Sequence, residues 1–309
     1  MFVLLIGLMG VGAMIPAGRY EIMQGVKTDY GTTVGRAAVR DLKTRGMLNP
    51  TGWQGILPPP IWQPANVRPF FINGANTVQP FVAIDPLGCA AAGFGSQFPF
   101  GAPSSLSLTR IYPSASLGTG PLADPIFRCS DDLVTVPGVG RDMPPTQYMM
   151  GGTSKRSSEG NYSWLATIAT DPTSSALNTK AIVSIVTFYK RDLASAASSE
   201  STCVASPASL VNWIGEVILD NPPRLLRAGQ WFMLAGNLNV PDPLPPHLQI
   251  QTITCRWYRV IGASTLRAGR FQDVTVAGPD FDLTATNVTA WMFQGVIAVN
   301  EKNMQLEIE

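Results

Sequence analysis

The first 48 residues constrain the fold more than any other part of the chain. From Phe2 to Ile15 the sequence is an unbroken apolar run, FVLLIGLMGVGAMI, and no charged residue precedes Arg19. As a helix, residues 1–17 would be about 25 Å long at ~1.5 Å per residue, slightly shorter than a bilayer core of about 30 Å. The run therefore predicts a helix that anchors the protein in a membrane. A secretory signal peptide is the alternative, but no basic segment precedes the run.

A second helical pattern follows Pro16. Apolar residues recur every four positions, which is typical of a slowly wrapping helical stripe: Ile22, Val26, Tyr30, Val34, Ala38 and Leu42. The segment also keeps three glycines, Gly25, Gly31 and Gly35. Each glycine costs a helix about 1 kcal/mol relative to alanine, so they indicate close packing or bending. We expect one helix from near Phe2 to about Met47, with Pro16 as the place where it would bend.

The rest of the chain has the composition of a loop-rich β protein. Charged residues make up 14% of the sequence, and the formal net charge is +1, which gives nucleic-acid binding no support. The 29 glycines and 26 prolines favour strands and loops over further helices. Residues 49–150 are expected to form long loops with short strands, and residues 151–309 a β-rich head.

Two segments of the head are predicted to pair as an antiparallel hairpin over residues 162–190. Tyr162–Thr170 alternates in polarity, and Ala181–Lys190 is rich in β-branched and aromatic residues. Short apolar runs separated by turn residues then continue over 203–309, which indicates a small barrel-like module or a strongly curved sheet. The predicted fold class is α+β, with a long N-terminal helix followed by a mainly antiparallel β head.

Four cysteines are widely spaced, and no two of them form a CxxC pair that would suggest a zinc site. In an exported protein they could form two disulfides, and we expect these to be Cys89 with Cys129 and Cys203 with Cys255. Four buried thiols are the alternative, and the sequence leaves both open.

The sequence offers no catalytic or cofactor site. His247 is the single histidine and lies in a proline-rich segment, so no histidine-based metal cluster can form. A GxSxG nucleophile motif is absent as well. The spacing of Gly7, Gly10 and Gly12 within the apolar run is typical of helix–helix packing positions. We therefore predict a protein that is not an enzyme and binds neither cofactor nor metal.

Two segments resemble a known family. GLMGVGAMIPAGRYEI, residues 7–22, is similar to the N-terminal helix of type IV pilins and type II secretion pseudopilins. GRAAVRDLKTRGMLNPTGW, residues 35–53, resembles the helix end of large bacterial prepilin-like proteins. If Pro16 matches the proline of the family helix, six residues would precede Met1, including the family's glutamate and the processing site.

The resemblance implies a structural subunit of a pilus-like or type II secretion filament. It implies anchoring in the bacterial inner membrane before assembly, and then a periplasmic or cell-surface filament. The partners would be copies of the chain or other pilins and the inner-membrane assembly machinery, without nucleic acid. The residues implied in anchoring and packing are Phe2, Leu5, Gly7, Leu8, Gly10, Gly12, Ile15 and Pro16. Two alternatives remain: a secreted or anchored β-domain protein that binds a ligand or glycan, and a virion or phage-tail structural protein.

Overall fold

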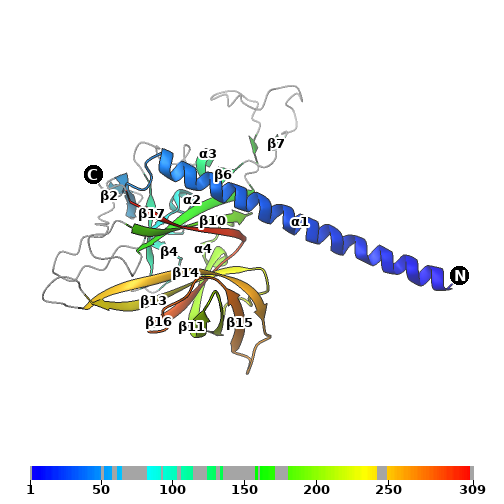
Figure 1. Ribbon diagram of the computed structural model, residues 1–309. Coiled ribbons are helices and arrows are strands. Elements are labelled where there is room, and N and C mark those ends of the chain that lie inside the picture. The colour runs from blue at the N-terminus through cyan, green and yellow to red at the C-terminus, as the bar shows by residue number, and fades with distance from the viewer. Residues whose placement is uncertain are drawn as a thin grey trace.

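One long helix leads into a β-rich head. The computed structural model describes residues 2–49, 52–57, 61–64, 82–91, 93–102, 106–113, 124–129, 133–134, 157–158, 161–170, 180–241 and 249–306. α1 (Phe2–Thr44) is an unbroken helix of 43 residues that continues through Pro16. Its C-terminal half lies on the head, and its N-terminal half extends far beyond it (Figure 1).

A nine-stranded sheet forms the middle of the head, in the order β17-β10-β9-β3-β5-β1-β2, with β4 beside β5 and β6 beside β9. Its strands are β1 (Gln54–Leu57), β2 (Ile61–Pro64), β3 (Val82–Ile84), β4 (Gln97–Phe98), β5 (Leu108–Tyr112), β6 (Arg128–Cys129), β9 (Tyr162–Thr170), β10 (Lys180–Tyr189) and β17 (Val296–Gln305). β3 and β5 are parallel, and the other pairs are antiparallel. Short elements complete this part: α2 (Pro86–Ala90), α3 (Asp124–Phe127) and the pair β7 (Leu133–Val134) and β8 (Ser157–Ser158).

The predicted hairpin is confirmed. β9 and β10 pair antiparallel from Tyr162 opposite Tyr189 to Thr170 opposite Ala181. Both faces of this hairpin are buried, which explains why the two strands are apolar almost throughout. Val183 and Ile185 pack in the cluster that includes α1, whereas Val186 and Phe188 pack in a cluster on the other face.

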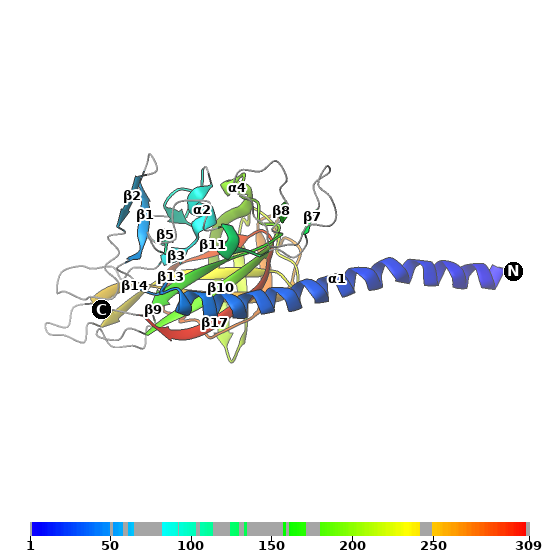
Figure 2. The same ribbon diagram turned by 90° about the horizontal axis from the view of Figure 1, so that it is seen from above.

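A closed barrel of six strands covers this other face. Its strands are β11 (Glu200–Val211), β12 (Ile214–Asp220), β13 (Trp231–Pro241), β14 (Gln249–Ala263), β15 (Phe271–Ala277) and β16 (Thr286–Phe293), in the order β11-β12-β15-β14-β13-β16. The head thus has three layers, α1, the sheet and the barrel (Figures 1 and 2). Trp257 of β14 joins the last two, because its Nε1 donates to Thr167 Oγ1 of β9 at 3.2 Å.

The barrel is an insertion between two neighbouring strands of the sheet. β10 ends at Tyr189, and β17 begins at Val296 and pairs with β10. Between them, α4 (Ala196–Ser199) precedes the barrel, whose first and last residues, Glu200 and Phe293, are paired. The sequence placed a barrel-like module at 203–309; the barrel instead closes over 200–293, and β17 belongs to the sheet.

The predicted α+β fold class is wrong. The described residues are mainly β, because a barrel and a nine-stranded sheet make up the head. Besides α1, the helices among the described residues are only four or five residues long.

The expected transmembrane helix is also corrected. None of the helices in the described part of the chain is both long and apolar enough to cross a bilayer. α1 has the length, but charged residues interrupt it from Arg19 onward.

Candidate assembly interface

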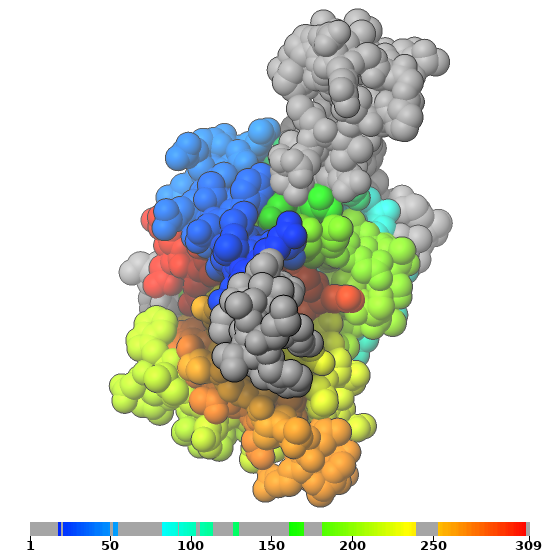
Figure 3. All heavy atoms as spheres, turned by 90° about the vertical axis from the view of Figure 1, so that its right-hand side faces the viewer, coloured from blue at the N-terminus to red at the C-terminus, as the bar shows by residue number. Residues whose placement is uncertain are grey.

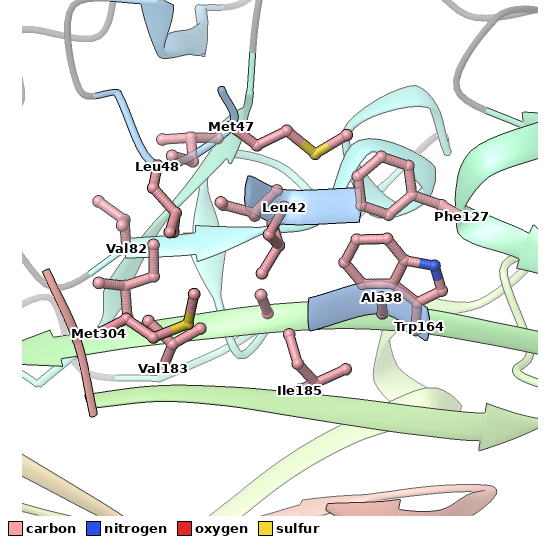
Figure 4. Packing of buried hydrophobic residues seen from close by; sticks show 14 of the residues in the cluster. Ala38, Leu42, Met47, Leu48, Val82, Phe127, Trp164, Val183, Ile185 and Met304 are labelled. Atoms are coloured by element: carbon pink, nitrogen blue, oxygen red, sulfur yellow. The ribbon is translucent and has the colours of Figure 1, made fainter. Parts of the chain in front are cut away.

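The C-terminal half of α1 is docked on the sheet through an apolar face. Val34, Ala38 and Leu42 are buried in one cluster with residues of β3, β5, β9 and β10. Figure 4 shows Ala38 and Leu42 among the side chains of Trp164, Val183 and other members of the cluster. This half of the helix is therefore part of the core of the head.

Two glycines let the helix approach the sheet closely. A methyl group on Gly31 would collide with the Ile297 side chain, and one on Gly35 would collide with the Asn300 amide; both neighbours belong to β17. At the same level, Thr187 Oγ1 of β10 donates to the Gly31 carbonyl at 3.2 Å. Close packing, one of the two explanations that the sequence left open for three glycines, is confirmed for Gly31 and Gly35 but not for Gly25.

An aromatic cluster lies where α1 leaves the head. Tyr30 of α1 packs against Tyr162 of β9 with ring centroids 4.4 Å apart, and Tyr162 contacts Tyr189 of β10 at 5.2 Å. Lys27 Nζ lies 4.3 Å from the centroid of the Tyr189 ring, a distance typical of a cation–π contact. These contacts fix the direction in which the free half of the helix points.

The free half of α1 carries a second apolar surface that is exposed. Ile22, Met23 and Val26 are 68%, 57% and 61% exposed. Gly18 and Gly25 lie beside them, and a methyl group on either would meet no other part of the chain. We call Gly18, Ile22, Gly25 and Val26 the free face of α1.

The free face points away from the sheet. A helix turns about 100° per residue, so apolar residues that repeat every four positions drift by about 40° at each step. From Ile22 to Leu42 the stripe makes five such steps and moves to nearly the opposite side of the helix. The head that covers Leu42 therefore leaves Ile22 and Val26 uncovered.

The residues that the sequence placed in membrane anchoring and packing lie at the far end of the same helix. Phe2, Leu5, Gly7, Leu8, Gly10, Gly12, Ile15 and Pro16 belong to α1, and their side chains are outside the described residues. The exposed surface around Ile22 was not singled out from the sequence. The sequence feature that could have revealed this surface is the drift of the four-residue repeat. The drift places Ile22 and Leu42, the two ends of the apolar stripe, on different sides of the helix.

The other chemically distinctive group is a cluster of four buried charges, which we call the ion cluster. It consists of Asp85 at the end of β3, Arg110 of β5, Arg191 after β10 and Glu200 at the start of β11, and their side chains are 0–1% exposed. Arg191 Nη1 and Nη2 donate to the two carboxylate oxygens of Asp85, each at 2.7 Å. Arg110 donates to Asp85 and, at 2.8 and 3.1 Å, to both oxygens of Glu200.

The ion cluster joins the inserted barrel to the sheet. Arg191 and Glu200 flank the segment that enters the barrel, whereas Asp85 and Arg110 belong to the sheet layer. Phenylalanine rings lie against the guanidinium groups. Arg110 Cζ is 5.0 Å from the centroid of the Phe98 ring, and Arg191 Cζ is 4.9 Å from the centroid of the Phe188 ring. The two positive and two negative charges cancel, so the cluster is electrically neutral.

Two members of the ion cluster, Asp85 and Arg191, are held in their charged forms by their neighbours. Burial raises the pKa of Asp85, but Arg191 and Arg110 outweigh this effect and hold the pKa of that carboxyl well below its usual range. Burial likewise opposes the charge on Arg191, but Asp85 and Glu200 raise the pKa of its guanidinium above the ordinary value. These two groups therefore stay charged at neutral pH, as a structural ion pair requires.

We expect acid to weaken the junction at Asp85. Because its folded-state pKa lies below the unfolded value of about 3.9, this carboxylate stabilises the fold above about pH 4, and the contribution is lost as the pH falls toward the folded-state value. Denaturant titrations between about pH 6 and pH 3 should show a steeper loss of stability for the wild type than for Asp85→Asn. Equal slopes would contradict this role of Asp85.

The structure records all four cysteines as thiols rather than as disulfides. Cys203 packs in the barrel interior, whereas Cys255 packs in the cluster between the barrel and the sheet. Their strands, β11 and β14, lie on opposite sides of the six-stranded barrel, three strand-to-strand steps apart in either direction. Burial raises the pKa of both thiols to about 12. The Cys203–Cys255 pairing is incompatible with this arrangement.

The described residues contain no group of three or more His, Cys, Asp or Glu side chains that could hold a metal ion. His247 lies outside the described residues. No family model, curated protein or solved structure matches this chain.

Proposed function

We propose that this protein is a non-enzymatic structural subunit that assembles with copies of itself, or with related subunits, through the free half of α1. One observation carries the proposal. α1 has an apolar face that its own head cannot cover, because Ile22 and Val26 belong to the half of α1 that extends beyond the head and are turned to nearly the opposite side of the helix from Leu42. Burying a large apolar side chain contributes about 1.5–3 kcal/mol, so a second helix packed here would be stabilised.

Two further features support a pilin-like filament as the assembly. The helix motif of residues 7–22 resembles the N-terminal helix of pilins and pseudopilins. A single long helix, half docked on an antiparallel hairpin and half free, also suits a subunit whose helices pack together while the heads remain outside. The proposal concerns contact between helices and does not require α1 to cross a membrane.

The test introduces two negative charges on the free face of α1 by substitution. In the full-length chain, Ile22→Asp with Val26→Asp should weaken self-association by more than about tenfold, because each carboxylate would have to be desolvated in the helix–helix contact. Sedimentation velocity and negative-stain electron microscopy measure the loss of assemblies. The head should keep its circular dichroism spectrum and its unfolding midpoint, because both residues lie outside the core.

A matched control places the same charges on another side of the helix. Gln24→Asp with Thr28→Asp changes two exposed positions of the same segment, and we expect association to be retained. If both double variants associate like the wild type, the free face is not an assembly surface. If both lose association equally, the effect is one of net charge.

A further inference from the structure

The two ends of the barrel differ in character. At one end, which we call the tip end, the β11–β12 turn meets the segment 278–285, and Gly278 N donates to the Trp213 carbonyl at 3.1 Å. At the other end, which we call the arginine end, segment 221–230 meets segment 264–270, and Asn221 N donates to the Arg270 carbonyl at 2.9 Å. Alternating strand directions in the antiparallel barrel place these pairs of connections at opposite ends.

The tip end is apolar and acidic. Val211, Trp213 and Ile214 are 55%, 69% and 60% exposed, and Leu283 beside them is 48% exposed. Asp280 and Asp282 are the charged residues of segments 211–214 and 278–285, and both are exposed. These segments contain no basic residue.

The backbone of the tip turn is strained by the tryptophan. Val211 pairs with Ile214, so the hairpin closes through two residues, Asn212 and Trp213, with φ of 58° and 68°. A two-residue turn with both φ values positive normally has Asn followed by Gly, and a bulky side chain in this region is an outlier. A strained residue that exposes a large aromatic surface indicates a functional contact.

The arginine end is basic and also apolar. Segments 221–230 and 264–270 contain no acidic residue and four arginines: Arg224, Arg227, Arg267 and Arg270. The adjoining strands supply partners for two of them, since Arg270 pairs with Asp220 and Arg267 with Asp273. Nη2 of Arg224 is buried and has no hydrogen-bond partner among the described residues, whereas Arg227 is exposed without a described ion pair.

Exposed leucines lie among these arginines. Leu225 is 47% exposed and Leu266 is 40% exposed. The connecting segments at each end thus carry exposed large apolar side chains and charged residues of one sign, opposite at the two ends. In the adjoining strands, Asp220 and Asp273 pair with two of the four arginines, and the exposed Arg259 lies opposite Ala277 near the tip end.

We propose that the barrels of two copies of this chain dock head to tail, with the tip end of one on the arginine end of the next. Trp213 and Ile214 would pack against Leu225 and Leu266, while Asp280 and Asp282 would face the exposed Arg227. A second copy is the occupant, because one molecule carries both complementary surfaces. This contact deepens the proposed assembly function and rests on it for its role within a filament, although it uses a separate surface.

The head-to-tail contact and the α1 contact are compatible in space. The sheet lies between the barrel and the docked half of α1, and the free half of α1 extends beyond the head, so the two contacts use different parts of the molecule (Figures 1 and 2). Figure 3, which views the molecule from the side of the free end of α1, shows the barrel residues, yellow-green to orange, below the helix. A contact between unlike ends leaves one free end on each partner, and such contacts extend into open chains or rings.

The test uses the full-length chain with Ile22→Asp and Val26→Asp, which removes the α1 contact. Sedimentation velocity over a concentration series should still show association, and added salt should weaken it because charge complementarity is screened. Trp213→Gly removes the indole and suits the left-handed backbone, so it should weaken association about tenfold or more without unfolding the hairpin. Arg227→Glu should have a similar effect.

Mixing the two variants gives the sharpest result. The Trp213→Gly chain keeps its arginine end and the Arg227→Glu chain keeps its tip end, so together they should form a one-to-one dimer and nothing larger. Lys302→Glu, an exposed position on β17 with the same change in charge, is the control and should leave association unchanged.

The outcomes separate the two proposals. A chain with Ile22→Asp and Val26→Asp that does not associate overturns the barrel contact and leaves the α1 proposal standing. If this chain associates regardless of Trp213→Gly and Arg227→Glu, the barrel contact is overturned, and the α1 proposal stands only where that association is weaker than that of the wild type. A mixture that restores no dimer overturns the head-to-tail geometry. Association that ignores the α1 substitutions but is lost with Trp213→Gly overturns the α1 proposal and supports the barrel contact. Trp213-dependent binding to phosphatidylcholine vesicles without self-association would identify a lipid surface as the occupant and overturn the inference.

Discussion

Arg191→Met should lower the free energy of unfolding by about 3–5 kcal/mol, the usual cost of removing one partner from a buried ion pair. The guanidinium makes two hydrogen bonds to Asp85 and one to Glu200, and its side chain is 1% exposed. After the substitution, Arg110 alone would face two buried carboxylates. One negative charge would then remain in the interior without compensation.

Chemical denaturation of the full-length chain measures this loss, and Arg267→Met is the matched control. Arg267 pairs with Asp273 at 3.4 Å, but their side chains are 62% and 46% exposed. Exposed pairs contribute only about 0–1 kcal/mol, so the control should change little. Similar losses of stability in both variants would show that the buried ion cluster stabilises the fold no more than an exposed ion pair does. Because Arg191 lies where the chain enters the barrel, the variant should also make residues 190–200 more susceptible to proteolysis.

The ion cluster could not have been assembled from the sequence. Arg110 and Glu200 are 90 residues apart, and Arg191 and Asp85 are 106 residues apart. No local spacing links them, because the contact exists only after the barrel folds back on the sheet. The available signal was a charged residue inside an apolar strand, as for Arg110 in LTRIY. A charge so placed must find a buried partner, but the strand does not say which one.

The local sequence pattern predicted strand pairing correctly where two strands that follow one another in sequence are also adjacent in the sheet. β9 and β10 follow one another and pair, so alternation and β-branched content located them to within a residue. The partner of the last strand, β17, could not be predicted in this way. Val296–Gln305 follows the barrel in sequence but pairs with β10, since the whole barrel is inserted between them. Hydrophobic periodicity marks a strand but does not name its partner.

The fold class was wrong for a related reason. The helical part of the predicted α+β class rested on the first 48 residues, whereas the strands after residue 200 form a closed six-stranded barrel. The sequence of α1 also contains a pattern that predicts which sides of the helix are buried. A four-residue repeat on a 3.6-residue helix drifts steadily, so the stripe from Ile22 to Leu42 predicts two surfaces rather than one. The structure shows one surface buried and the other exposed.

Gly35→Leu should lower the free energy of unfolding by about 1–3 kcal/mol, the cost of overpacking a close contact. Even a methyl group at this position would meet the Asn300 side chain of β17. A leucine must displace Asn300 and lift the docked half of α1 from the sheet, which would also loosen Val34 and Ala38 in the core. The gain in helix propensity over glycine, about 1 kcal/mol, offsets only part of this loss.

Thr33→Leu is the control, because it introduces the same side chain two residues away on the exposed side of the docked helix. Leucine has a better helix propensity than threonine by a few tenths of a kcal/mol, so this variant should be slightly more stable than the wild type. The two substitutions should thus move the denaturation midpoint in opposite directions. A stabilising Gly35→Leu would mean that α1 can sit higher on the sheet at no cost. The glycines at positions 31 and 35 would then have no role in docking the helix, and the direction in which the free face points would not be fixed by close contact with β17.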